Sequence, residues 1–136
     1  MDLVNWDIMN ENTKFKAIVL TNSLTLKMLK ADIDNADIEL IGVSKESEFI
    51  SYLQSEHFDI VLIDNLYKEA ENICYSVCEI APIAILVREA EVDWHKLMTW
   101  EADGFVSEDC GRTEFITRIK AISRSRRKSP GLIKSK

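Results

Sequence analysis

The stretch "FDIVLIDN", from Phe58 to Asn65, contains a continuous apolar run that ends in an aspartate, Asp64. Unbroken apolarity over about four to eight residues is typical of a strand that is covered on both faces, as in a parallel sheet. Ligands of open α/β sheets bind beyond the carboxyl ends of the strands. The position of Asp64 therefore raises the question of whether this acid takes part in chemistry.

Four more segments share this apolar, β-branched character and predict four further strands: "KAIVLT" (Lys16–Thr21), "IELIGV" (Ile38–Val43), "PIAILV" (Pro82–Val87) and "GFVS" (Gly104–Ser107). Apolar stripes at helical spacing lie between them and after the last one: Leu24/Met28/Leu29/Ile33, Phe49/Ile50/Leu53, Ile73/Val77/Ile80, Trp94/Leu97/Met98 and Phe115/Ile116/Ile119/Ile122. This alternation predicts an α/β fold with a doubly wound, five-stranded parallel sheet flanked by five helices.

Composition indicates one ordinary globular domain. The chain has 136 residues, of which 46% are hydrophobic and 29% charged, and a net charge of −6. No apolar run reaches the roughly 18–20 residues of a membrane span. The start, "MDLVNWDIMNENTKF", lacks the cationic and apolar blocks of a signal peptide. We therefore expect a cytoplasmic protein without membrane contact.

The cysteines and histidines do not suggest a catalytic or metal site. The three cysteines, Cys74, Cys78 and Cys110, lack the pairing of a disulfide framework. Cys74 and Cys78 are four residues apart, without further ligands nearby, and are expected to be small buried hydrophobic residues. His57 and His95 have no acid, base or nucleophile at helical spacing, so we expect both at the surface.

The segments "KAIVLTNS", "FDIVLIDN", "PIAILV" and "EADGFVSED" occur in an order and spacing that resemble the receiver domain of two-component response regulators. The resemblance covers residues 16–127. The last helix, "EFITRIKAISRSRRK", is similar to the OmpR-type subclass, whose receivers precede a winged-helix DNA-binding domain. Residues 1–15 then form an N-terminal extension that packs on the domain or caps a partner. Residues 128–136 form a linker or disordered tail, in which part of the basic charge lies.

The resemblance implies that Asp64 stands where the family carries its phosphoacceptor. Several neighbouring positions depart from the family. Thr21 and Asn22 replace an acidic pair, Val87 replaces a Thr or Ser, and Glu108 replaces a Lys. The degenerate pocket expected from this comparison consists of Thr21, Asn22, Val87, Arg88, Phe105 and Glu108, where Phe105 takes the place of the family's switch aromatic.

These departures remove what phosphoryl transfer needs. Mg²⁺ prefers carboxylate oxygens, and Thr21 and Asn22 offer only neutral ones. A glutamate at position 108 repels a phosphoryl group where a lysine attracts it; two unit charges about 4 Å apart interact by roughly 4 kcal/mol at an effective dielectric constant of about 20. We therefore expect no metal, no cofactor and no catalytic residue. Asp64 is expected to be a structural carboxylate, kept ionised by solvent or by Lys68 or Arg88, and an Asp64–Arg88 ion pair is one hypothesis.

If the switch is fixed, function lies in surfaces. In OmpR-type receivers, charged residues on the fourth helix, fifth strand and fifth helix pair across a two-fold axis. Asp103, Arg118 and Lys120 match this pattern, whereas Gly104 replaces one acidic member. The expected dimer face consists of these three residues together with Trp94 and Arg124. A homodimer is one interpretation, and a solvated charged face is the other. Trp94 and Trp100 cannot face the same way on one helix, so we expect one to be buried and the other available.

The sequence thus predicts an atypical, non-enzymatic receiver that acts without phosphorylation. It would dimerise and control a DNA-binding transcriptional output that this chain does not contain. Two alternatives remain: a stand-alone pseudo-receiver that binds a protein partner, and an active phosphoacceptor that uses Asp64 with an unusual set of ligands.

Overall fold

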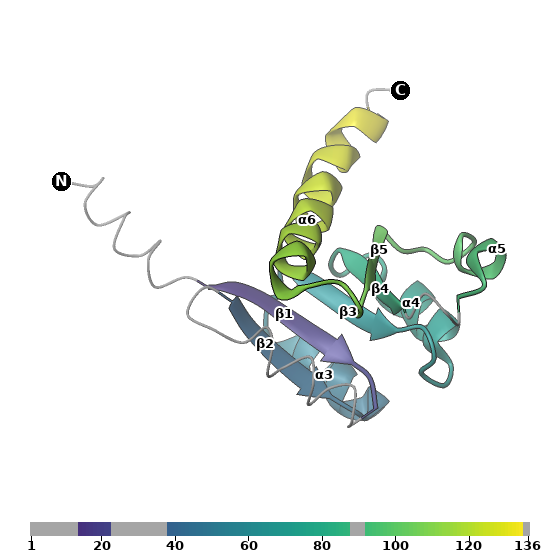
Figure 1. Cartoon of the computed structure of the whole chain (residues 1–136). Coiled ribbons are helices and arrows are strands. Elements are labelled where there is room, and N and C mark those ends of the chain that lie inside the picture. Colours follow the sequence, from purple (N-terminus) through teal and green to yellow (C-terminus); the bar gives the residue numbers. More distant parts are fainter. Residues whose placement is uncertain (1–13, 23–37, 88–91, 135–136) are drawn as a thin grey trace.

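The computed structural model describes residues 14–22, 38–87 and 92–134, with side chains up to residue 125. Five parallel strands form one sheet in the order β2-β1-β3-β4-β5 (Figure 1). The strands are β1 (Phe15–Leu20), β2 (Ile38–Val43), β3 (Ile60–Asp64), β4 (Ile83–Val87) and β5 (Gly104–Ser107). The predicted doubly wound parallel sheet is therefore confirmed, and each strand lies within two residues of its predicted start.

The described helices are α3 (Glu46–Ser55), α4 (Ala70–Val77), α5 (Trp94–Leu97) and α6 (Arg112–Lys134). They agree with four of the five apolar stripes. The stripe that begins at Leu24 lies outside the described residues, as does the N-terminal extension up to residue 13. None of the described helices is long and apolar enough to cross a membrane.

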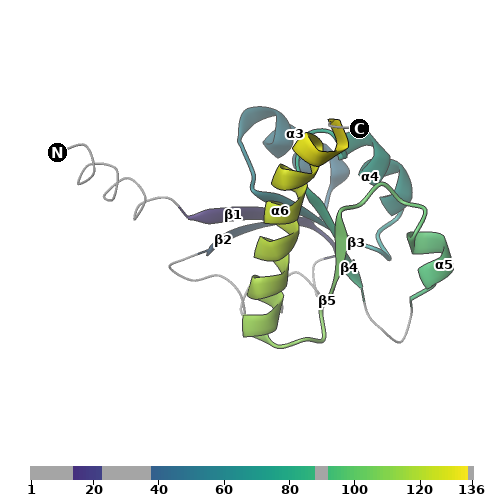
Figure 2. The same ribbon diagram turned by 90° about the horizontal axis from the view of Figure 1, so that it is seen from above.

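The two faces of the sheet carry separate hydrophobic clusters, because successive side chains of a strand point to opposite sides. On one face, Ile18, Val61 and Ile63 pack with residues of α3, α4 and α5. On the other, Val19 and Leu62 pack with residues of α6. Figures 1 and 2 show α6 on one side of the sheet and α3 and α4 on the other. Double coverage explains why "FDIVLIDN" is apolar without alternation.

Two helices differ in length from their predicted stripes. α4 ends at Val77, so Ile80 follows it and is 55% exposed. α5 has only four residues, and its first turn is capped by the Asp93 carboxylate, which accepts a hydrogen bond from the Lys96 amide. Trp100, expected on this helix, lies in the turn after it and is buried against the core.

α6 is the longest helix, at 23 residues, and it continues beyond the sheet toward the C-terminus (Figure 1). Its start packs on the sheet through Phe115 and Ile119. It includes residues 128–134, which the sequence assigned to a linker or tail. The role of that segment as a linker stays a prediction.

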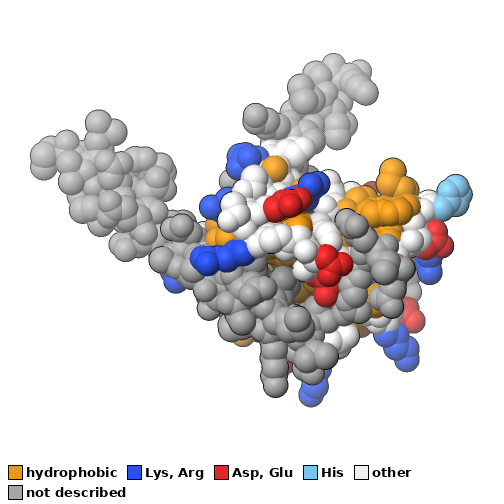
Figure 3. Space-filling model, viewed as in Figure 1, with side chains coloured by type: hydrophobic (Ala, Val, Ile, Leu, Met, Phe, Trp, Pro, Cys, Tyr) orange, Lys and Arg blue, Asp and Glu red, His pale blue; other side chains and the backbone are white. Residues whose placement is uncertain are grey.

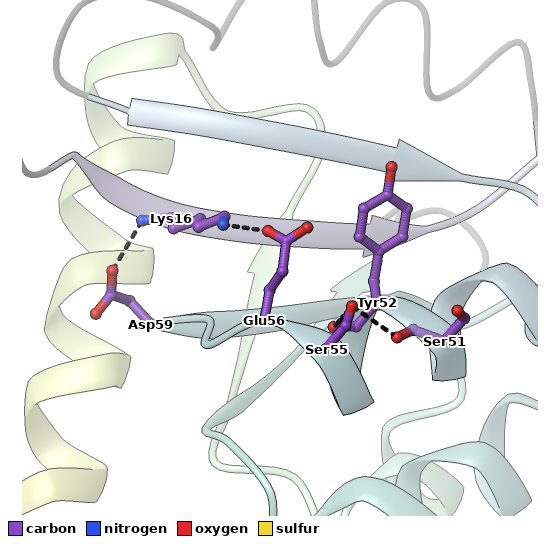
Figure 4. Close-up of polar contacts among 6 residues, drawn as sticks. All are labelled: Lys16, Ser51, Tyr52, Ser55, Glu56 and Asp59. Carbon is purple, nitrogen blue, oxygen red and sulfur yellow. Dashed lines mark hydrogen bonds and ion pairs between the residues drawn. The ribbon is translucent and has the colours of Figure 1, made fainter.

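The amino end of β3 is fixed by Asp59 (Figure 4). Its carboxylate accepts a hydrogen bond from the Lys16 backbone N–H at 2.8 Å, and its own N–H donates to the Lys16 carbonyl at 2.8 Å. The Ser123 hydroxyl of α6 donates to the Asp59 carbonyl at 2.7 Å. The Lys16 ammonium group pairs with Glu56 at the end of α3. These contacts fix β1, β3, α3 and α6 relative to one another. They therefore help to position Asp64 at the opposite end of β3.

Candidate functional site

The candidate site lies at the carboxyl edge of the sheet, where the ends of β1, β3, β4 and β5 meet. The register places Leu20 beside Ile63, Asp64 beside Leu86, and Val87 beside Ser107. Backbone hydrogen bonds continue past the strand ends, from Asn65 N–H to the Leu86 carbonyl and from Glu108 N–H to the Val87 carbonyl. The sequence-predicted residues Thr21, Asp64, Val87 and Glu108 are therefore all on one edge.

The Asp64 carboxylate is buried and held by two donors. Asp64 is 1% exposed, and Thr21, directly after β1, is 0% exposed. The Thr21 hydroxyl donates to Asp64 Oδ2 at 2.5 Å. The Leu66 backbone N–H donates to Asp64 Oδ1 at 2.9 Å, which closes a turn after β3. Both carboxylate oxygens thus accept a hydrogen bond from the protein.

Asp64 is buried rather than exposed to solvent at the mouth of the sheet. Lys68 is exposed, and among the described residues it forms no ion pair with Asp64. Arg88 lies outside the described residues, so the Asp64–Arg88 pair stays a hypothesis. In the described part of the chain, the Thr21 hydroxyl and the Leu66 amide take the place that a cation was expected to fill.

The remaining positions of the degenerate pocket differ in burial. Val87 is buried at the end of β4, Glu108 is half-buried after β5, and Asn22 is exposed. Phe105 is half-buried on β5 and packs edge-to-face on Trp94, with ring centroids 5.5 Å apart at an angle of 84°. Phe105, at the position expected for the switch aromatic, therefore contacts Trp94 of α5 through its ring and has no hydroxyl group to form a hydrogen bond.

A cavity of about 410 Å³ opens beside this ring pair, between the ends of β4 and β5 and the starts of α5 and α6. Ser107, Asp109 and Cys110 contribute to its wall. Burial raises the pKa of the Cys110 thiol above its ordinary value, and the neighbouring Glu114 carboxylate adds to the effect. Cys110 therefore stays a neutral thiol at neutral pH.

The face formed by α5, β5 and α6 is partly apolar. Trp94 is 47% exposed and Met98 is 70% exposed, whereas Trp100 is 8% exposed. The prediction that one tryptophan is buried and the other available is confirmed. Figure 3 shows hydrophobic side chains gathered on the surface at the position of α5. A second cavity, of about 580 Å³, lies along β5 and α6 on this face.

Gly104 has a packing role on this face. A Cβ atom at this position would lie 2.7 Å from Ile122 Cδ1 and 2.8 Å from Ile122 Cγ1, both closer than real Cβ contacts. The missing side chain lets Ile122 of α6 lie directly on β5. The departure from the family's acidic residue at position 104 therefore accompanies close packing of α6.

The charged residues proposed for a dimer face do not all lie on one surface. Asp103 and Arg118 line the 580 Å³ cavity. Asp103 also accepts a hydrogen bond from the Ile83 backbone N–H at 2.8 Å, and Arg118 lies 3.6 Å from the Glu114 carboxylate.

Lys120 points elsewhere, since its ammonium group lies 5.9 Å from the centroid of the Phe15 ring on β1. Arg124 is exposed near the end of the packed part of α6.

The cysteines and histidines differ in burial. Cys74 is fully buried, and burial raises the pKa of its thiol to about 12. Cys78 is half-buried rather than buried, and both histidines are exposed, as predicted. Within the described ranges, no group of three His, Cys, Asp or Glu residues could hold a metal ion.

Reasoning from the sequence missed two contacts that define this edge. The Thr21–Asp64 hydrogen bond was missed because Thr21 was treated only as a weak metal ligand. Its signal was present: residues that directly follow neighbouring parallel strands lie side by side. The contact of Trp94 with Phe105 joins residues 11 apart in the chain, and no local spacing predicts it.

Comparison with known proteins adds the fold family. No family model matches the sequence. No curated protein matches it either. Among solved structures, a response regulator from Thermotoga maritima is 19% identical, with a TM-score of 0.69, covering 82% of this chain and 99% of that one.

Two further structures agree with it. A putative response regulator from Chloroflexus aurantiacus is 16% identical, with a TM-score of 0.70 and coverage of 82% and 99%. A response regulator receiver modulated diguanylate cyclase from Pelobacter carbinolicus is 18% identical, with a TM-score of 0.66 and coverage of 88% and 99%. Together with the strand order, these neighbours establish that the chain has the receiver fold of response regulators.

Proposed function

We propose that this chain is an atypical receiver domain that works without phosphorylation of Asp64. The observation that carries the proposal is the hydrogen bond from the Thr21 hydroxyl to Asp64 Oδ2 at 2.5 Å, with both residues buried. A carboxylate attacks phosphorus through a free oxygen lone pair. Here Asp64 is 1% exposed, with one oxygen bound by Thr21 and the other by the Leu66 amide, so a phosphodonor reaches a lone pair only if the surrounding residues move.

The residues around Asp64 do not fit Mg²⁺ and a phosphoryl group. Mg²⁺ at such sites is held by one or two carboxylates together with phosphate oxygens. The Thr21 hydroxyl donates a hydrogen bond to Asp64. Glu108, directly after β5, adds a negative charge where phosphoryl transfer needs charge neutralisation. We therefore infer that this site does not carry out phosphoryl transfer.

The output of the domain, in this proposal, is a protein contact through α5, β5 and α6. Trp94 and Met98 are large side chains exposed on this face, and buried aromatic residues commonly supply much of the binding energy of an interface. The proposed partner is a second copy, which would hold a DNA-binding transcriptional output in a fixed arrangement inside the cytoplasm. The placement of Lys120 over Phe15 means that the OmpR-type charge pattern is only partly reproduced on this face.

The exposed apolar face also fits a second candidate function, a stand-alone pseudo-receiver that binds another protein. Analytical ultracentrifugation separates the two. For a homodimer we expect a concentration-dependent increase in mass that Trp94→Ala weakens, while His95→Ala, a change at an exposed neighbour on α5, leaves it unchanged. A monomer at all concentrations would favour the stand-alone module.

Phosphorylation is tested by incubating the protein with Mg²⁺ and acetyl phosphate, followed by intact-mass measurement. We expect no gain in mass. An active receiver run in parallel provides the positive control. A gain of about 80 Da, the mass of one phosphoryl group, that disappears in Asp64→Asn would overturn the proposal and favour the active phosphoacceptor.

A further inference from the structure

The 410 Å³ cavity between β5, α5 and α6 has a size within the range typical of small-molecule sites, roughly 300–1,000 Å³. Its wall includes two aromatic rings, Trp94 and Phe105, and three charged side chains, Asp109, Glu114 and Arg118. The function proposed above uses the outer surface of this region but assigns nothing to the cavity. Its lining indicates what chemistry the cavity accepts.

The two rings form a corner. Their planes meet at 84°, with centroids 5.5 Å apart, and the Trp94 side chain remains 47% exposed. Aromatic faces carry partial negative charge and attract cations within about 6 Å of the ring centroid, most strongly for tryptophan. Such corners suit cations that carry methyl groups, because these groups contact aromatic surface without requiring hydrogen bonds.

Two other aromatic rings of this protein each have a lysine ammonium group over them. Lys16 Nζ lies 5.2 Å from the centroid of Phe58, and Lys120 Nζ lies 5.9 Å from that of Phe15. Among the described residues, no lysine or arginine lies over Trp94 or Phe105 in this way. Within the described part of the chain, the corner at the cavity therefore has no cation over either ring.

The charges around the cavity favour a cation as well. Asp109 and Glu114 are negative, and Arg118 is positive but lies 3.6 Å from the Glu114 carboxylate. Pairing of Arg118 with Glu114 leaves Asp109 as the net charge beside the rings. A metal ion is a poor occupant, because hard cations need several oxygen ligands and the described residues offer no group of three acidic, histidine or cysteine side chains.

We propose that this cavity binds a small organic cation with a methylated ammonium group, held by the faces of Trp94 and Phe105 and balanced by Asp109. The proposal does not rest on phosphorylation-independence or on dimerisation, because each of its contacts lies within one chain. It assigns Trp94 a second role, since its exposed face would contact the ligand.

The test uses choline as the probe and 3,3-dimethyl-1-butanol, its uncharged analogue of the same shape, as the ligand control. Isothermal titration calorimetry of the full chain is performed at low protein concentration, so that the result is independent of self-association. We expect choline to bind more tightly than the alcohol by between about twofold and about thirtyfold, the range that cation–π energies imply. Equal affinities, or no heat with choline, would overturn the proposal.

Three variants locate the site. Trp94→Leu and Asp109→Asn are expected to weaken choline binding, and Trp94→Leu should also remove the preference for choline over the alcohol. Glu79→Gln makes the same charge change at an exposed residue that does not line the cavity, and it should bind choline like the parent protein. Circular dichroism confirms that each variant is folded. Loss of binding in Glu79→Gln equal to that in Asp109→Asn would reduce the effect to general electrostatics and contradict the assigned site.

Discussion

Asp59 and Asp64 stand at the two ends of one strand, in the same eight-residue stretch, and they perform different tasks. Asp59, at the amino end, is half-buried and joins β3 to β1 and α6 through main-chain and hydroxyl contacts. Asp64, at the carboxyl end, is 1% exposed and accepts a hydrogen bond from a hydroxyl. The amino end of this sheet is thus a structural clamp. At the carboxyl end, where ligands of such sheets bind, Asp64 is buried.

The comparison teaches that burial, rather than residue type, separates the two acids. Water can replace a lost partner at Asp59, because that residue remains partly accessible. At Asp64 water is excluded, so each lost donor leaves a charged oxygen without solvation. The effects of mutation should therefore be larger at the carboxyl end than at the amino end.

The largest effect is expected for Thr21→Val, which preserves the shape of the side chain and removes the hydroxyl that donates to Asp64. We expect the free energy of unfolding to fall by about 2–3 kcal/mol, as for buried hydrogen bonds to charged groups. Urea denaturation followed by circular dichroism measures the change. Thr21→Ser keeps the donor and should recover most of the loss. A change below about 0.5 kcal/mol in Thr21→Val would mean that the hydroxyl does not sustain Asp64.

A smaller effect is expected for Asp59→Ala, which removes the acceptor of the Lys16 N–H at the opposite end of β3. We expect a loss of about 1–2 kcal/mol in the free energy of unfolding, reduced by the access of water to this position. The same urea experiment measures it. If Asp59→Ala proved more damaging than Thr21→Val, the proposed order of the two ends would be reversed.

Ser123→Ala probes the contact of α6 with the amino end. The Ser123 hydroxyl donates to the Asp59 carbonyl, a bond between neutral groups, so we expect a loss of about 1 kcal/mol. Thr117→Ala, which removes a hydroxyl at an exposed position on the same helix, is the matched control and should lower stability little. Equal losses in both variants would show that the Ser123–Asp59 hydrogen bond does not cause them, since alanine itself favours a helix.

The smallest effect concerns pH. The hydrogen bond to Glu56 raises the pKa of Lys16 above its ordinary value of 10.5. A raised lysine pKa contributes stability that is fully present below pH 10.5 and is lost as pH rises through the folded-state pKa. Lys16→Met should therefore flatten the decline in stability above pH 10.5 by a small amount, because this pair is partly exposed to solvent. Unchanged steepness in the variant would show that the Lys16–Glu56 pair is not coupled to folding.

Much of the fold could be predicted from local patterns. Unbroken apolar runs such as "PIAILV" identify strands that are buried on both faces, and the stripe around Phe49 identifies α3. The position of Asp64 at the carboxyl edge follows from parallel strand order. The structure thus places Thr21, Asp64, Val87 and Glu108 on one edge, as parallel strand order predicts, and a functional role of that edge stays a prediction.

Other features depend on contacts between distant residues and could not be predicted in this way. α5 ends before Trp100, which is buried in a core that other elements also build. Lys120 was assigned to the dimer face from the resemblance to OmpR-type receivers, but its ammonium group lies 5.9 Å from the centroid of the Phe15 ring at the start of β1. The burial of Asp64 likewise depends on Thr21, which lies 43 residues earlier in the chain.

The close contact of Ile122 with Gly104 limits how this surface can be engineered. Placing an aspartate at position 104, to rebuild an OmpR-like charge pair, would require the Ile122 side chain or α6 itself to shift. Redesign of partner choice is therefore better begun at Thr117 or Ala121, which border the same hollow and are exposed on α6. Because α6 contacts β5 at a position that has no side chain, substitutions that create new partner contacts are best accommodated on the outer face of α6.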